Sequence, residues 1–133
     1  MSSIFSKIVK GEIPSYKVAE DENYYAFLDI APLSKGHTLV IPKKEIDYMF
    51  SLDDETYQGL WAFARKVALG IEKAVSCKRV GVAVLGLDVP HAHIHLIPLN
   101  EMEDFDFKKK KLKLEKEEFI EIATAISKAV DLK

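Results

Sequence analysis

A seven-residue segment in which histidine alternates with apolar residues constrains this chain most. It reads His91-Ala92-His93-Ile94-His95-Leu96-Ile97, and we predict that it belongs to a strand from His91 to Pro98. Successive side chains of a β-strand point to opposite faces of the sheet, so the three imidazoles are expected in a row on one face. The opposite face is wholly apolar and must belong to the core. The pattern therefore predicts a buried sheet that displays a row of titratable nitrogen bases.

Four other apolar segments separated by short turns are predicted as strands. They are residues 16–20, 24–30, 37–41 and 80–85. Residues 4–10 have the pattern of a short helix. These segments predict an α+β fold, a five-stranded antiparallel sheet backed by helices on one side, within a single domain of residues 1–133.

Two longer helices are also predicted. Between the third and fourth strands, Ser51 and Asp54 have the spacing of a capping box, and an apolar stripe follows over residues 57–71. This is the long central helix. A second apolar stripe, over residues 119–130, predicts a C-terminal helix.

Composition excludes several classes of protein. The 133 residues include 19 basic and 21 acidic side chains, a net charge of −2, so no overall positive field favours nucleic acid as a partner. Cys77 is the only cysteine, which rules out a disulfide within the chain and favours a reducing compartment. Without a signal-peptide pattern or a run of about 20 apolar residues, we expect a cytoplasmic protein with no membrane segment.

Three interpretations of the histidine row compete. Histidines on a strand can simply form hydrogen bonds with solvent or carbonyl groups. Two histidines at positions i and i+2 can also bind a metal, although three in line cannot all reach one ion at about 2.0–2.1 Å without distorting the strand. The third interpretation, which we favour, is a phosphate-handling site: a neutral imidazole is a nucleophile near pH 7, and a neighbouring imidazolium can neutralise phosphate charge.

Three segments together resemble the histidine triad (HIT) family. Residues 91–97 resemble its His-φ-His-φ-His-φ-φ signature, where φ is apolar, and residues 4–14 resemble its opening segment. Residues 27–32 and 36–43 resemble its middle block. The likeness covers about residues 4–98, whereas residues 99–133, a loop and the C-terminal helix, match nothing specific.

The resemblance implies a homodimer that acts at the α-phosphate of purine nucleotide conjugates, such as dinucleoside polyphosphates or nucleoside phosphoramidates, without a cofactor. His93 would attack phosphorus and form a nucleotidyl-histidine intermediate, and His91 would support it. The other implied contacts are phosphate with His95 and His37, ribose with Asp29, and the base with Ile8, Phe27 and Ile30. From the pattern alone, Phe27 and Ile30 fit core packing equally well, and Asp29 fits a strand-end carboxylate.

The sequence departs from the family pattern at two places. Many bacterial relatives bind zinc through two cysteines and a histidine at the positions of Ser3, Ser6 and Glu45, so we predict no metal here. In a shortened loop, residues 85–90, Asp88 stands where a small hydroxyl residue often contacts phosphate. A carboxylate there would repel phosphate unless it is protonated or turned away, so turnover or leaving-group preference is expected to differ.

Two alternatives to this enzymatic function stay open, and one charged segment has more than one interpretation. The chain could be a nucleotide-binding module of weak catalytic power, or a metal-dependent hydrolase. The lysine-rich run Lys108–Lys113 is flanked by acidic residues, which favours a solvated surface loop over a patch that binds polyphosphate or nucleic acid.

Overall fold

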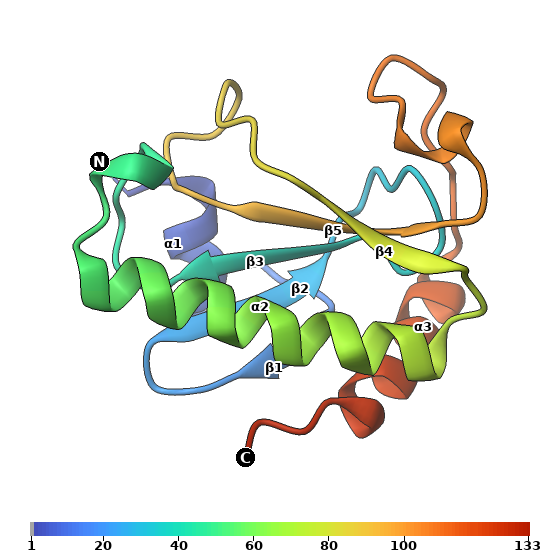
Figure 1. Ribbon diagram of the computed structural model, residues 1–133, viewed down its shortest axis with the longest axis horizontal. Helices are drawn as coiled ribbons and strands as arrows, with labels where there is room; N and C mark the ends of the chain where they lie inside the picture. Colours follow the sequence, from blue (N-terminus) through green and yellow to red (C-terminus); the bar gives the residue numbers. More distant parts are fainter. Residues whose placement is uncertain (1) are drawn as a thin grey trace.

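The computed structural model describes residues 2–133, and at its centre lies a five-stranded antiparallel sheet (Figure 1). The strand order is β1-β2-β3-β5-β4. The strands are β1 (Lys17–Glu20), β2 (Tyr24–Leu28), β3 (Thr38–Pro42), β4 (Arg79–Ala83) and β5 (Ile94–Leu99). The predicted α+β architecture is confirmed, with each strand within a few residues of its predicted bounds.

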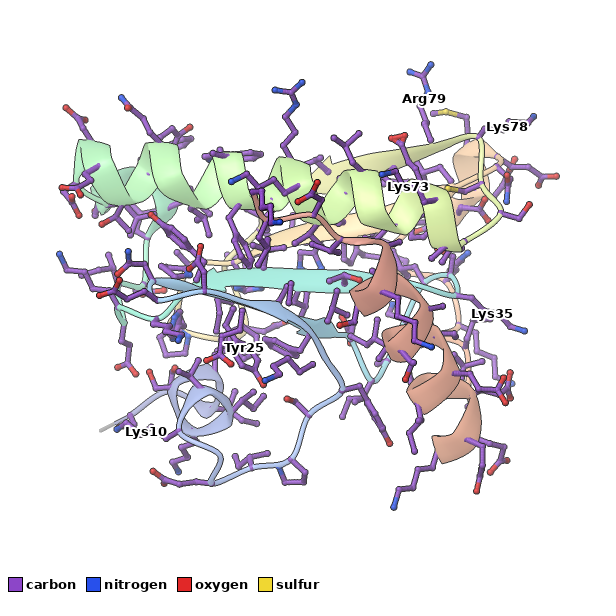
Figure 2. All side chains as sticks on the ribbon, turned by 90° about the horizontal axis from the view of Figure 1, so that it is seen from below. Lys10, Tyr25, Lys35, Lys73, Lys78 and Arg79 are labelled. Carbon is purple, nitrogen blue, oxygen red and sulfur yellow. The ribbon has the colours of Figure 1, made fainter. Side chains whose placement is uncertain are left out.

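Three α-helices cover the sheet. They are α1 (Ile4–Val9), α2 (Asp54–Ala74) and α3 (Lys116–Ala129), and two short 3-10 helices, η1 (Met49–Ser51) and η2 (Met102–Phe105), complete the elements. The long helix α2 crosses one face of the sheet, whereas α1 lies on the opposite face (Figures 1 and 2). The expectation that the helices lie on one side is therefore wrong for α1. Both faces of the central strands are apolar, so both need a cover.

The start of α2 also differs from the prediction. Asp53, not Ser51, is the N-cap residue, and its carboxylate accepts a hydrogen bond from the Thr56 amide. Ser51 instead ends η1. The acidic residues Asp54 and Glu55 occupy the first turn, where the helix dipole favours negative charge.

Two apolar clusters fill the two sides of the sheet. The larger cluster lies under α2 and α3 and includes Ala92, Ile94 and Leu96, as the alternating pattern predicts. The smaller cluster lies under α1 and includes Phe5 and Phe27. The histidines share this second side, since the Phe5 ring centroid lies 5.0 Å from that of His93 and 5.9 Å from that of His91.

Strand β5 begins at Ile94, three residues later than predicted. The β3–β5 pairing ends at Val40 and Ile94. The next β3 residue that would donate an amide hydrogen to β5 is Pro42, and proline has none. The Ala92 amide donates instead to the Ile46 carbonyl oxygen over 2.7 Å. The first two histidines of the segment, His91 and His93, therefore lie just before the strand rather than on it.

Charged side chains extend outward over the surface, as Lys10, Lys35, Lys73, Lys78 and Arg79 illustrate (Figure 2). Within residues 2–133, no helix combines the length and apolar character that crossing a membrane requires.

Candidate active site

A cavity of about 540 Å³ opens on the α1 side of the sheet. Its walls come from α1, the end of β2, the loop of residues 85–89, the start of β5, and the segment that contains Phe107 and Lys111. All the site residues predicted from the sequence line it except His91. They are His93, His95, His37, Ile8, Phe27, Asp29, Ile30 and Asp88.

The three apolar residues predicted to contact the base differ in how deeply they are buried. Phe27 belongs to the smaller apolar cluster and is almost fully buried, so it packs in the core as well as lining the cavity. Ile30 is 74% exposed, so it does not pack in the core. Ile8 of α1 is half-buried at the cavity edge.

His93 is held in one tautomer. Its Nδ1 lies 2.7 Å from the backbone carbonyl oxygen of His91, and because a carbonyl only accepts, Nδ1 carries the hydrogen. In the neutral ring the lone pair is then on Nε2. None of residues 2–133 forms a hydrogen bond with that nitrogen, and the ring lines the cavity. A neutral imidazole with a free Nε2 is suited to nucleophilic attack.

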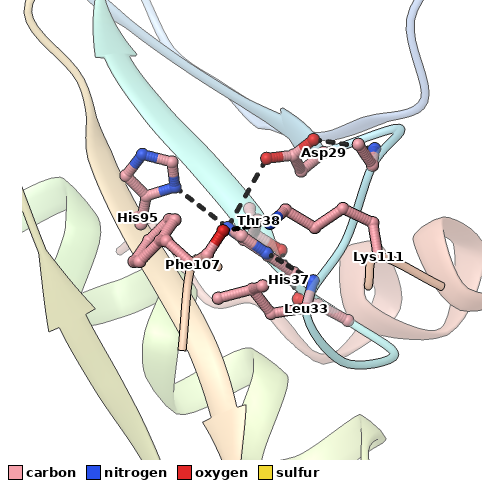
Figure 3. Close-up of polar contacts among 9 residues, drawn as sticks. Asp29, Leu33, His37, Thr38, His95, Phe107 and Lys111 are labelled. Carbon is pink, nitrogen blue, oxygen red and sulfur yellow. Dashed lines mark hydrogen bonds and ion pairs between the residues drawn. The ribbon is translucent and has the colours of Figure 1, made fainter. Parts of the chain in front are cut away.

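His37 and His95 form a chain with a defined direction (Figure 3). The Leu33 amide donates to His37 Nδ1 over 3.0 Å, so His37 carries its hydrogen on Nε2 and donates it to His95 Nδ1 over 2.9 Å. His95 is then left with a hydrogen on Nε2. Both nitrogens of His37 have hydrogen-bond partners, although the residue lines the cavity, and its contact with phosphate stays a prediction.

Burial keeps both of these imidazoles neutral. Desolvation, with a smaller contribution from the neighbouring His95, lowers the pKa of His37 to about 3. Desolvation, with a smaller contribution from His93, lowers the pKa of His95 to about 4. Near pH 7 the pair therefore offers a hydrogen-bond donor to an anion but no positive charge.

The turn that joins β2 to β3 brings Asp29 and His37 together. The Asp29 amide donates to the His37 carbonyl oxygen, and the Ala31 amide donates to Asp29 Oδ1 over 2.9 Å. Gly36 has φ +97°, a left-handed conformation that side chains disfavour, immediately before His37. Asp29 Oδ2 lies 3.6 Å from His37 Nε2, and burial raises the pKa of this carboxyl group. Asp29 is thus both a turn residue and a cavity residue.

His91 is fully buried and points away from the cavity into a second polar network. Its Nε2 donates to the Pro42 carbonyl oxygen over 2.7 Å, so its Nδ1 accepts from the Ser3 hydroxyl over 2.8 Å. Glu45 Oε1 accepts from the Ser3 amide and from the Ser6 hydroxyl, each over 2.6 Å. These hydrogen bonds, that of Ser6 first, lower the pKa of Glu45 to about 2. The network ties α1 to the segment that carries the histidines.

Two of the cavity residues that the sequence reasoning missed, Phe107 and Lys111, come from the segment after the family resemblance. Lys111, expected in a solvated loop, lines the cavity, and the Phe107 ring centroid lies 5.1 Å from that of His95. Lys108, Lys110 and Lys113 are exposed, as expected of the loop. The only local signal was the presence of Phe107, with Met102 and Phe105, in a charge-rich stretch, and that signal does not reveal which surface the ring covers.

The fold and the site together define a class of α+β proteins in which histidines at the start of a central strand line a cavity under the N-terminal helix. The HIT domain model matches residues 10–102, so the chain belongs to the histidine triad family.

Individual relatives agree with this assignment. An adenosine 5′-monophosphoramidase of Schizosaccharomyces pombe is 46% identical over 100 residues, which cover 74% of each chain. The crystal structure of a Hit-like protein from Bartonella henselae superposes with a TM-score of 0.85 at 33% identity, covering 97% of this chain and 96% of that one. A Zn-bound histidine triad protein from Mycobacterium smegmatis has a TM-score of 0.80 at 28% identity, covering 96% and 95%.

The donor set at Ser3, Ser6, Glu45 and His91 does not fit zinc. The serine hydroxyls are poor zinc ligands at neutral pH, and both His91 ring nitrogens and Glu45 Oε1 are already used by the hydrogen bonds above. The absence of a metal from this protein stays a prediction.

A second set of potential ligand atoms lies in the cavity itself. Asp29, His37 and His95 each place one such atom within 4.8 Å of the others. A cation there would have to displace the hydrogen shared between His37 and His95, and it would be repelled by the nearby charge of Lys111, which already acts on Asp29 and His37. His37 Nε2 and His95 Nδ1 already satisfy each other through their hydrogen bond without an ion.

Proposed function

We propose that this protein is a hydrolase or nucleotidyl transferase that acts at the α-phosphate of purine nucleotide conjugates through a nucleotidyl-histidine intermediate on His93. The observation that carries the proposal is the 2.7 Å hydrogen bond from His93 Nδ1 to the His91 carbonyl oxygen, which leaves the Nε2 lone pair at the cavity wall. Family membership and the S. pombe phosphoramidase support the reaction class.

In the first step, His93 Nε2 attacks the α-phosphorus. The new P–N bond forms as the bond from phosphorus to the leaving group breaks, and the leaving group departs with the bonding electrons and takes up a proton from water. The imidazole becomes positively charged, and the His91 carbonyl stabilises that charge through the Nδ1 hydrogen. His95 Nε2 donates to a phosphate oxygen, and His37 holds His95 in the donating tautomer.

In the second step, water or another acceptor attacks the same phosphorus. The P–N bond breaks, its electron pair returns to Nε2, and the attacking group gives up a proton to solvent. Water yields the nucleoside monophosphate, and another acceptor yields its nucleotidyl conjugate. We propose that Asp29 binds the ribose hydroxyls and that Ile8, Phe27 and Ile30 contact the purine, because these side chains line the same cavity as His93. Base and ribose binding would hold phosphorus within reach of the nucleophile.

The test is the turnover of a purine nucleoside phosphoramidate and of a dinucleoside polyphosphate by His93→Ala and His93→Gly. We expect both variants to lose on the order of 10³-fold or more on both substrates. Lys110→Met, on the exposed part of the lysine run, is the control and should behave like the wild type. Intact-mass measurement after an alkaline quench should show a nucleotidyl adduct on the wild type and none on either variant. Wild-type turnover by either variant would exclude His93 as the nucleophile.

Asp88 favours one alternative, a nucleotide-binding module of weak activity. This exposed carboxylate lines the cavity, where it would repel a phosphate group. A wild-type protein that binds purine nucleotides but forms no adduct would support this alternative. The metal-dependent alternative predicts that a chelator abolishes turnover and that about one stoichiometric ion is found, whereas the His93 mechanism predicts full activity in chelator.

We also propose a cytoplasmic homodimer. The terminal strand β4 supports dimerisation, since it exposes Val82 and is followed by the exposed Leu85. An apolar terminal strand is a template for pairing with a second chain. A cytoplasmic location is supported by the single unpaired cysteine, Cys77.

A further inference from the structure

The segment after the family match returns to the cavity. The family model ends at residue 102, and the chain then passes through η2 and a turn before α3 begins. Phe107 packs edge-on against two histidines, with its ring centroid 5.1 Å from that of His95 and 6.4 Å from that of His37. The Leu112 amide donates to the Pro32 carbonyl oxygen over 2.9 Å. These contacts hold the segment against the site.

Lys111 brings a positive charge to the cavity wall. Among the described residues that line it, Lys111 is the only lysine or arginine, and Asp29 and Asp88 are the acidic ones. His37 and His95 are neutral near pH 7, because burial lowers the pKa of each. The Lys111 charge already contributes to the pKa values of both Asp29 and His37, which places it on their side of the cavity.

The Lys111 ammonium group can donate one more hydrogen bond than the two it forms with the protein. It donates to the carbonyl oxygens of Phe107 and Lys109, and an ammonium has three donors. Figure 3 shows the Lys111 side chain extending between Asp29 and His37. A phosphate beside His95 would need such a charge, since a neutral imidazole donor alone only partly offsets an anion moved out of water.

We propose that Lys111 is a phosphate-binding residue, whose ammonium contacts a non-bridging oxygen of the α-phosphate that His95 also holds. This inference rests on the proposed function, because it assumes that the phosphate occupies this cavity. It assigns a role to a residue outside the matched HIT domain. Phe107 positions the same turn by supplying the carbonyl acceptor and by covering His95.

The experiment compares the binding of AMP and of adenosine by calorimetry, because the two probes differ only in the phosphate. Lys111→Gln removes the charge but keeps a donor for the two carbonyl groups, and Lys111→Met removes both. Lys111→Arg keeps the charge, and Lys110→Met is the exposed neighbouring control. We expect Lys111→Gln and Lys111→Met to weaken AMP binding about tenfold or more while adenosine binding is unchanged. Lys111→Arg and Lys110→Met should stay within about threefold of the wild type.

Three results would overturn the inference. Equal losses for AMP and adenosine would assign Lys111 a merely structural role, and unchanged AMP binding in Lys111→Gln would show that its charge is not used. A wild type that binds AMP no better than adenosine would also overturn it. Failure of the proposed function is a separate result, since a protein that binds AMP through Lys111 but forms no adduct on His93 would retain this inference and lose the mechanism.

Discussion

His93 and His91 are joined by a hydrogen bond of 2.7 Å, from the imidazole Nδ1 of one to the backbone carbonyl oxygen of the other. The ring of His91 lies outside the cavity, anchored by Ser3 and the Pro42 carbonyl. The proposed nucleophile is thus oriented by a backbone group whose own position depends on a buried network. Substitutions in that network are expected to act on stability and on the site together.

Glu45→Gln tests the charge at the exposed end of this network. Hydrogen bonds from Ser6 and Ser3 lower the Glu45 pKa from 4.5 to about 2. A carboxyl group with a lowered pKa in the folded state stabilises the protein above its ordinary pKa, and this contribution is lost as pH falls toward the folded value. We expect Glu45→Gln to lower the Tm at pH 7 and the difference from wild type to shrink between about pH 5 and about pH 2. Glu121→Gln, on the exposed side of α3, should have no such effect. Thermal unfolding followed by circular dichroism is the measurement, and a constant Tm difference would contradict the prediction.

The neutral histidine pair predicts a second pH dependence. Burial lowers the pKa of His37 to about 3, so the unfolded chain binds a proton that the folded protein does not as pH falls below the ordinary value of 6.5. Folding stability must therefore decrease from about pH 7 toward about pH 4. His37→Gln, which can accept from Leu33 and donate to His95, should remove roughly 3 kcal/mol of that decrease. Denaturant unfolding at several pH values measures it. The same pH slope in the variant and the wild type would show that His37 does not titrate in this way.

Asp88→Ser tests whether the carboxylate limits turnover. Removing a negative charge at the cavity wall should raise kcat/KM several-fold for a purine phosphoramidate, because repulsion of the phosphate is relieved. Asp88→Asn should give a similar increase if charge alone is responsible. Steady-state kinetics at low ionic strength is the measurement, with Glu121→Gln as a charge-matched control. A decrease in both Asp88 variants would instead assign Asp88 a productive role in the reaction.

Val82→Lys tests dimerisation through β4. Val82 is 47% exposed on the terminal strand, and a lysine there should block pairing with a second chain. Ile120→Lys is matched, since Ile120 is 46% exposed on α3. We expect a dimer for the wild type and for Ile120→Lys in sedimentation equilibrium, and a shift toward monomer for Val82→Lys. A monomeric wild type, or a Val82→Lys variant that remains dimeric, would count against this interface.

Structural features that follow from a regular spacing of apolar residues within one segment were predictable from the sequence. The apolar stripe of α2, the antiparallel strands and the burial of Ala92, Ile94 and Leu96 all follow from side-chain spacing along one segment. The cavity residues Asp29, His93 and His95 were predictable because each belongs to a recognisable motif. Even here the boundary of β5 was wrong, since Pro42 on a distant strand decides where its ladder ends.

What the sequence determined by itself is therefore the set of strands and α-helices, the family, and the histidines and aspartates of the cavity lining. Tertiary structure decided which nitrogen of each histidine carries its hydrogen, because the deciding partners, the Leu33 amide and the His91 and Pro42 carbonyls, are set by the folded backbone. It also decided that Lys111 reaches the cavity. A flexible charged side chain has no periodic signature, and its place depends on how a loop closes onto residues more than seventy positions earlier in the chain.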